Sequence, residues 1–142
     1  MKIGIASDHG GYKLKEDLKK TLVEMAVDFD DCGVHDETSV DYPQIARKLC
    51  QEILEGKYDK GILLCGTGIG VSIVANRIKG IRAAACSDVF SAVMSREHND
   101  ANVLCMGGRV VGPGLAGMMV KEWLNTEFTG GRHARRVCMI DE

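Results

Sequence analysis

The sequence lacks several features that mark specialised classes of protein. It has only two prolines and no apolar run of about 20 residues, which excludes a collagen-like chain and gives no sign of a membrane span. No C-x-x-C pair occurs among its cysteines, so the usual zinc-binding and dithiol patterns are absent. No close pair of histidines and no H-E-x-x-H pattern occurs either, so we predict no metal site.

What is present describes an ordinary globular chain. At 142 residues we expect one domain spanning residues 1–142, which buries roughly 68–70% of its unfolded surface. The net charge of −2 excludes a strong nucleic-acid footprint but is compatible with a small anionic ligand. Asp8 and His9 interrupt the N-terminus before a signal peptide could form. We therefore expect a cytoplasmic protein in a reducing compartment, with the cysteines other than Cys65 as buried fillers.

Apolar runs and helical periodicity alternate along the chain. Strands are predicted at 2–7, 27–33, 61–65, 82–86 and 102–106. Helices are predicted from Leu14 to Val27, from Tyr42–Pro43 onward, over about 69–78 and 88–97, from Pro113, and after Gly130–Gly131. These units predict a right-handed, parallel, doubly wound α/β sheet. Ligands then bind beyond the carboxyl ends of the strands, near residues 7–9, 65–66, 86–88 and 106–109.

The stretch "CGTGIG" at 65–70 combines a strand-ending thiol with a glycine-rich turn. It matches neither a P-loop, which needs G-K-[ST] at its end, nor a dinucleotide fingerprint, which needs glycine where Val71 stands. Backbone N–H groups free of side chains at a helix N-terminus bind negative charge and favour a thiolate. Cys65 is therefore a candidate base or nucleophile, although a small core residue at a strand end is the alternative.

Other polar motifs occur at predicted element ends. "SDHGG" places Asp8 and His9 after the first strand, where Asp8 as a plain helix N-cap is the alternative. His98 ends the fourth helix, a position that favours histidine for structural reasons as well. In "GGRHARR", Arg132 and Arg136 would share one helix face and suit a phosphate, whereas a solvated terminal charge run is the alternative.

Five motifs together resemble the B-type ribose-5-phosphate isomerase family, which includes the subunits of galactose-6-phosphate isomerase. They are "SDHGG", "DYP", "CGTGIG", "REHNDAN" and "GGRHARR", in family order over nearly the whole chain. The resemblance implies a three-layer α/β/α Rossmann-like sandwich with a five-stranded parallel sheet. It also implies a homodimer or dimer of dimers, a C-terminal helix extending towards a partner subunit, and sites shared between subunits.

The resemblance also implies an activity: ribose 5-phosphate and ribulose 5-phosphate are interconverted in the pentose phosphate pathway without metal or cofactor. Cys65 would move the proton between C2 and C1, as in the relatives that do not place a glutamate at the position of Val71. His98 would open the furanose ring, with Asp8 and Asn99 beside the sugar hydroxyls. The groups implied to hold the enediolate oxygens are Thr67 and the amides of Gly66, Gly68, Ile69 and Gly70. The implied phosphate ligands are His9, Arg132, Arg136 and Arg109, and Tyr42 would line the pocket.

Three other functions compete with this one. A six-carbon aldose phosphate, such as allose or galactose 6-phosphate, could be the substrate. A non-catalytic sensor could bind a phosphorylated sugar in the same glycine turn. A nucleotide-binding module is disfavoured by the missing motif residues. Membrane and nucleic-acid partners are not expected.

Overall fold

The computed structural model describes residues 1–142 as an alternation of strands and helices. The strands are β1 (Lys2–Ser7), β2 (Asp28–Asp31), β3 (Lys60–Cys65), β4 (Ala83–Ala85) and β5 (Val103–Gly107). The helices are α1 (Tyr12–Glu24), α2 (Tyr42–Leu54), α3 (Ile69–Asn76), α4 (Val89–Glu97), α5 (Pro113–Asn125) and α6 (Arg132–Cys138). None of these helices has the length and apolar character needed to cross a bilayer.

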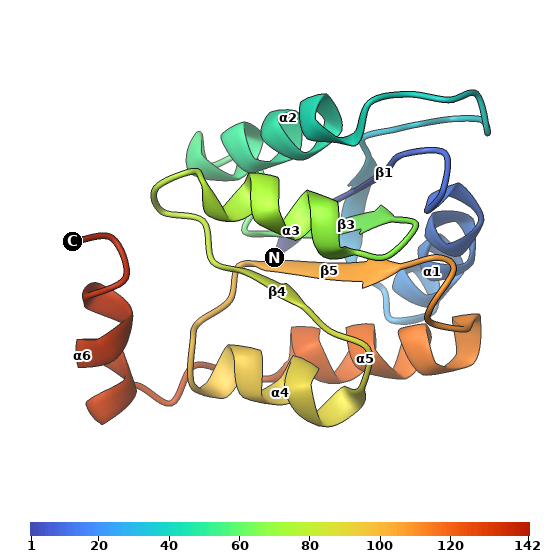
Figure 1. The fold of residues 1–142 in the computed structure, drawn as a ribbon. Helices are drawn as coiled ribbons and strands as arrows, with labels where there is room; N and C mark the ends of the chain where they lie inside the picture. The colour runs from blue at the N-terminus through green and yellow to red at the C-terminus, as the bar shows by residue number, and fades with distance from the viewer.

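The strands form one five-stranded sheet in the order β2-β1-β3-β5-β4, and every neighbouring pair is parallel. The predicted parallel α/β sheet is therefore confirmed. Because all strands run in one direction, the carboxyl ends of β1, β3 and β5 lie at the same edge of the sheet (Figure 1). We call this the carboxyl edge and the opposite one the amino edge.

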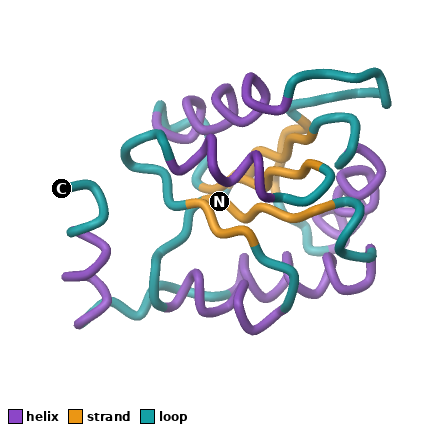
Figure 2. The backbone as a smooth tube through the Cα atoms, in the orientation of Figure 1, coloured by secondary structure: helices purple, strands orange, loops and turns teal.

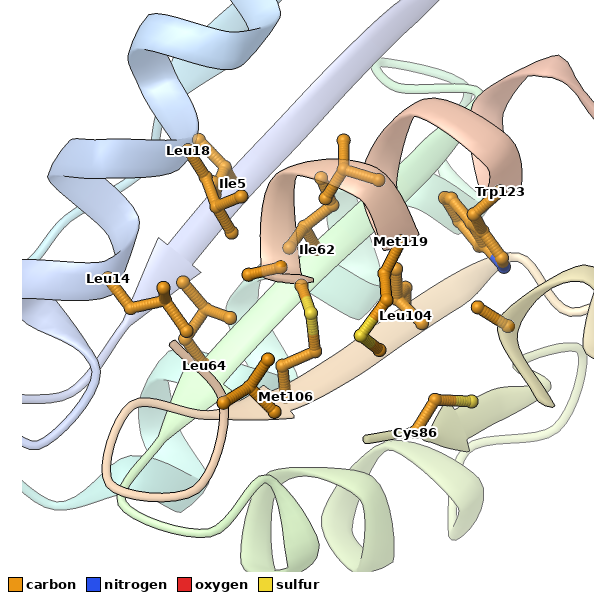
Figure 3. Packing of buried hydrophobic residues seen from close by; sticks show 14 of the residues in the cluster. Ile5, Leu14, Leu18, Ile62, Leu64, Cys86, Leu104, Met106, Met119 and Trp123 are labelled. Atoms are coloured by element: carbon orange, nitrogen blue, oxygen red, sulfur yellow. The ribbon is translucent and has the colours of Figure 1, made fainter. Parts of the chain in front are cut away.

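Helices cover both faces of the sheet, which confirms the three-layer sandwich. Side chains alternate along β3: Ile62 and Leu64 join the core with α1, α4 and α5, whereas Leu63 and Cys65 join the core with α2 and α3. Figure 3 shows the first of these cores, in which Trp123 of α5 is completely buried. The side chain of Cys65 is thus directed to the face covered by α2 and α3.

A buried ion pair anchors the segment that follows β2. Lys15 of α1 is 0% exposed, and its Nζ lies 2.6 Å from Asp31 Oδ1. Asp31 also binds Lys19 and accepts a hydrogen bond from the Gly33 amide. Burial alone would raise the pKa of Asp31, but its bonds to Lys15, Lys19 and the Gly33 amide outweigh burial and lower this pKa to about 2. Since Ser7 N–H donates to Gly33 O, the pair also supports the end of β1.

Some predicted details are wrong. The first helix ends at Glu24 rather than Val27, because Ala26 has a φ of 55° and turns the chain. The third helix ends at Asn76 rather than near residue 78. Cys138 is exposed and Cys32 is half-buried, so they are not buried fillers; no residue of α6 is buried, which leaves Cys138 in solvent.

The terminal helix α6 stands apart from the sandwich. Gly130 and Gly131 have φ values of 69° and 58°, and they turn the chain between α5 and α6. Figure 2 shows the loop that carries α6 away from the sheet, on the side opposite to the loops that follow β1, β3 and β5. The predicted break at the two glycines, followed by a short helix, is confirmed.

Candidate active site

The turns after β1, β3 and β5 pack backbone against backbone at the carboxyl edge. Gly108 N–H donates to Cys65 O, and Arg109 N–H donates to Gly66 O. A Cβ added to Gly10 would lie 3.0 Å from the Gly66 nitrogen, so a side chain there would crowd the loop after β3. The glycines of "SDHGG" and "CGTGIG" therefore bring these two motifs together.

In the loop after β3, a backbone N–H donates a hydrogen bond to the thiol of Cys65. Gly68 adopts a φ of 79°, and a Cβ on it would lie 2.7 Å from the Met106 carbonyl carbon, so glycine is required there. This turn aims the Gly68 N–H at Cys65 Sγ, 3.1 Å away. Cys65 is 4% exposed and lies among apolar neighbours on its inner side. The Gly68 amide therefore fixes the position of the Cys65 sulfur relative to the loop.

The next residues of this loop face outward. Thr67 and Ile69 are exposed, while Gly66 and Gly70 are half-buried. Thr67 Oγ1 accepts a hydrogen bond from Ile69 N–H at 3.2 Å. The loop thus exposes Thr67 and Ile69 at the start of α3, while the Gly68 and Ile69 amides donate to Cys65 Sγ and Thr67 Oγ1 within the loop.

Asp8 and His9 lie beside this loop. Asp8 Oδ1 accepts hydrogen bonds from the Gly10 and Gly11 amides, at 2.9 and 3.1 Å, so Asp8 shapes the turn that leads into α1. The helix begins at Gly11 as N-cap, and Asp8 is therefore not the plain N-cap considered as an alternative. Val40 N–H donates to His9 Nδ1 at 3.2 Å, which leaves Nε2 as the N–H donor of the neutral ring.

Tyr42 and Arg109 pack against the glycine loop from two sides. A Cβ on Gly70 would lie 2.5 Å from the Tyr42 ring, and a Cβ on Gly66 would lie 3.2 Å from Arg109 Nη1. Because both positions are glycine, the ring and the guanidinium approach the loop backbone closely. These predicted residues are therefore brought together at the carboxyl edge.

Two cavities open around His9. One, of about 530 Å³, is lined by Asp8, His9, Val40, Asp41, Tyr42, Pro43, Gln44 and Arg47. The other, of about 380 Å³, is lined by His9, Gly10, Lys13, Leu14, Glu37, Gly108 and Arg109. Cys65 and Thr67 line neither cavity. Gln44, Arg47 and Lys13 were not predicted as site residues. The available signal for the first two was their position on α2, two and five residues after Tyr42.

The remaining predicted residues form a second cluster. A cavity of about 360 Å³ is lined by His98, Asn99, His133, Arg136, Val137 and Ile140. The rings of His98 and His133 stack with centroids 4.2 Å apart and an interplanar angle of 11°. Burial lowers the pKa of His133, and the charges of His98, Arg132 and Arg136 add to this effect. His133 carried no independent signal in the sequence, although it lies inside the "GGRHARR" motif.

The two clusters lie at opposite edges of the sheet. Helix α4 leads from the carboxyl end of β4 to the amino end of β5, so His98 at its C-terminus lies at the amino edge. The nearby Asn102 accepts a hydrogen bond through its carbonyl from Gly61, at the start of β3. We call the group of Asp8, His9, Tyr42, loop 65–70 and Arg109 the carboxyl-edge half-site. We call the group of His98, Asn99, Arg132 and Arg136 the amino-edge half-site.

The other acidic and thiol side chains near strand ends or in the core have structural roles. Asp88, at the end of β4, caps α4 by accepting a hydrogen bond from Ser91 N–H at 2.7 Å. Burial raises the pKa of Cys50 to about 12 and that of Cys86 to about 11, so both remain neutral thiols. No group of three or more His, Cys, Asp or Glu side chains is arranged to hold a metal ion.

Comparisons with known proteins agree on one family. Residues 3–140 match the family described as Ribose/Galactose Isomerase. Ribose-5-phosphate isomerase B of Escherichia coli is 47% identical over 136 residues, which cover 96% of this chain and 91% of that protein. A D-erythrulose-4-phosphate isomerase of Pectobacterium atrosepticum is 42% identical over 139 residues, covering 96% and 91%. The structure of Clostridium thermocellum ribose-5-phosphate isomerase B superposes with a TM-score of 0.97 at 52% identity, covering 99% of this chain and 95% of that one.

Proposed function

Because the chain belongs to the ribose/galactose isomerase family, we propose that this isomerase interconverts D-ribose 5-phosphate and D-ribulose 5-phosphate through an enediolate. The observation that carries the proposal is the 3.1 Å contact between Cys65 Sγ and the Gly68 amide, within a loop that exposes Thr67 and Ile69. A base and donors for a developing negative charge are thereby held in one turn.

The reaction requires a proton to leave C2 and to arrive at C1. In the proposed mechanism the Cys65 thiolate removes the C2 proton of the open-chain aldose, and the electron pair moves to the C1 carbonyl oxygen. Thr67 and the amides of 66–70 bind the resulting enediolate, while one proton passes from O2 to O1. The Cys65 thiol then returns its proton to C1, which gives the ketose. A positioned base supplies typically about 10²–10⁴ in rate.

Substrate binding divides between the two half-sites. At the carboxyl edge, His9 Nε2–H and the Arg109 guanidinium are donors for the phosphate, and Asp8 and Tyr42 border the sugar. His98, as the acid or base that opens the ring, and Arg132 and Arg136, as further phosphate ligands, must come from another copy of the chain. A two-fold dimer would supply them, because the same contact then completes both sites.

The position of α6 supports this dimer. The helix has no buried residue in the isolated chain, and Met139 and Ile140, which follow it, are exposed large apolar side chains. Ile73 on α3 and Phe90 on α4 are also exposed, at 55% and 73%. Large apolar side chains that are exposed in the isolated chain, as these four are, are typical of a surface that is buried against another subunit. We therefore propose that α6 reaches across to the partner subunit.

Exchange with solvent tests the reaction and the substrate together. The protein is incubated in D₂O with ribose, allose, galactose and erythrulose phosphates, and carbon-bound protons are followed by NMR. We expect deuterium to enter the five-carbon sugar fastest. No exchange into any sugar phosphate would support the sensor, and faster exchange into a six-carbon or four-carbon substrate would replace ribose 5-phosphate.

A variant tests the base separately. Cys65→Ala should abolish turnover but leave sugar-phosphate binding largely intact, because the phosphate ligands lie elsewhere. Cys86→Ala is the matched control, since this buried thiol lies at another strand end. Near-normal turnover by Cys65→Ala would remove Cys65 from the mechanism while leaving the isomerase assignment standing.

A further inference from the structure

Arg96, in the last turn of α4, is a nearly buried cation that connects several segments. Its side chain is 8% exposed, and Nη1 donates to Asp100 Oδ1 at 2.8 Å and to Ala101 O at 2.7 Å. Nε donates to Thr126 O at 3.3 Å. The guanidinium carbon lies 5.9 Å from the centre of the Trp123 ring. One side chain therefore joins α4, the turn at 99–101, and the linker at 126–131 between α5 and α6.

These segments carry the amino-edge half-site. His98 follows Arg96 by two residues, Asn99 begins the turn, and the linker leads directly into Arg132. A second tether joins the linker to α4: Thr129 donates to Glu97 O from its hydroxyl at 2.8 Å and from its amide at 3.2 Å. Helix α6 has no buried residue, and it is held by the linker, by the stacking of His133 on His98, and by a hydrogen bond from Gly80 N–H to Asp141 beyond its C-terminus. The linker is the covalent connection that leads from the segment bound by Arg96 to the arginines of α6.

We propose that Arg96 is a positioning residue for isomerisation, which fixes His98 relative to the arginines of α6 by binding the α4 end, the 99–101 turn and the linker at once. The inference rests on the proposed function, in which both groups act on one substrate. Arginine suits this position because its rigid fork donates in several directions, whereas lysine has a single donor centre. A misplacement of about 1 Å can cost about 100-fold in rate.

A nearby residue provides a matched control. Arg82 also binds Asp100, from Nε to the carbonyl at 2.9 Å and from Nη2 to Oδ2 at 3.3 Å. Arg82 makes no hydrogen bond to the linker. Replacing it with lysine therefore weakens the Asp100 contact but leaves the linker bound to α4.

The experiment compares Arg96→Lys, Thr129→Val and Arg82→Lys with the unaltered protein. We expect kcat/KM for ribose 5-phosphate to fall about tenfold to 100-fold in Arg96→Lys. Thr129→Val should cause a smaller loss, and Arg82→Lys should stay within about twofold. Two signals report the geometry without turnover. Emission of Trp123, the one tryptophan of the chain, should change in Arg96→Lys, and the ring-current shifts of the stacked His98 and His133 should be lost.

Each outcome decides the inference. Unchanged histidine chemical shifts in folded Arg96→Lys would overturn the inference. A wild-type kcat/KM of this variant, measured well below the variant's melting temperature, would also overturn it. An equal loss in Arg82→Lys would also overturn it, because Asp100 rather than the linker would then be responsible. If Arg96→Lys does not fold, wild-type kinetics in Thr129→Val would overturn it. If the unaltered protein does not isomerise ribose 5-phosphate, the proposed function fails, whereas the histidine shifts still test the placement by Arg96.

Discussion

The proposed sharing of the active site between two chains predicts that inactive variants can restore each other. The first variant carries Cys65→Ala, in the carboxyl-edge half-site. The second carries His98→Ala and Arg136→Ala, in the amino-edge half-site. In the proposed dimer each variant alone should be inactive, because both of its sites lack an essential group. In a mixed dimer one site collects every substitution, and the other contains an intact half-site from each chain.

The structure sets the size of the expected effect. The strand β3 runs from Lys60 to Cys65, and at about 3.3 Å per residue it separates the two edges by roughly 17 Å. A catalytic group must act within about 3 Å of the reacting atoms, so Cys65 and His98 of one chain cannot serve the same sugar. With equal amounts and random pairing, half of the dimers are mixed, and about a quarter of wild-type activity should return.

The assay measures ribulose 5-phosphate formation after the two variants are unfolded together and refolded, or after co-expression with different tags. Cys65→Ala mixed with Thr67→Ala is the control, since both changes lie in the same half-site. That pair should regain nothing beyond the activity of its parents. Mixed dimers of the first pair that remain as inactive as their parents would refute the shared site.

Substitutions at Arg136, at Gly68 and at the Lys15–Asp31 ion pair give three further predictions. Arg136→Ala should raise KM about tenfold to 100-fold with a smaller effect on kcat, because a charged hydrogen bond to the phosphate contributes about 1.5–3 kcal/mol. An unchanged KM would mean that α6 does not bind the phosphate. Gly68→Ala should lower the melting temperature and abolish most of the turnover. A left-handed backbone costs an alanine about 1–2 kcal/mol, and the added Cβ would also contact Met106. A wild-type kcat in this variant would contradict the prediction. Asp31→Asn should destabilise by about 3–5 kcal/mol in urea unfolding, because Lys15 remains buried, and Lys15→Met should cost less. Because the Asp31 pKa is lowered to about 2, the stability it adds above pH 4 should be lost on acidification towards pH 2, and Asp31→Asn should remove that pH dependence.

Periodicity and glycine placement predicted most of the fold. The alternation of apolar runs with helical stripes identified the strands and the helices α1 to α5, since β1, β3 and β5 are almost wholly buried and each of these helices has a buried side. The short helix α6 was predicted from the two glycines that precede it. Helix ends were less accurate: nothing in the sequence shows that Ala26 takes a positive φ and ends α1 early. Burial of cysteines was also only partly predictable, because Cys138 lies on a helix that has no buried residue within its own chain.

The placement of the two half-sites at opposite edges of the sheet could have been inferred from the predicted topology alone. In a parallel sheet the helix after each strand returns to the amino edge, so a residue at a helix end lies far from residues at strand ends. His98 and Asn99 follow α4, whereas Cys65 and Asp8 follow strands. Motifs that alternate between helix ends and strand ends, yet belong to one reaction, therefore predict a shared active site before any coordinates are known. The stacked pair of His98 and His133 was not predictable in this way, because it depends on the conformation of the 126–131 linker, which Arg96 binds through Thr126 O.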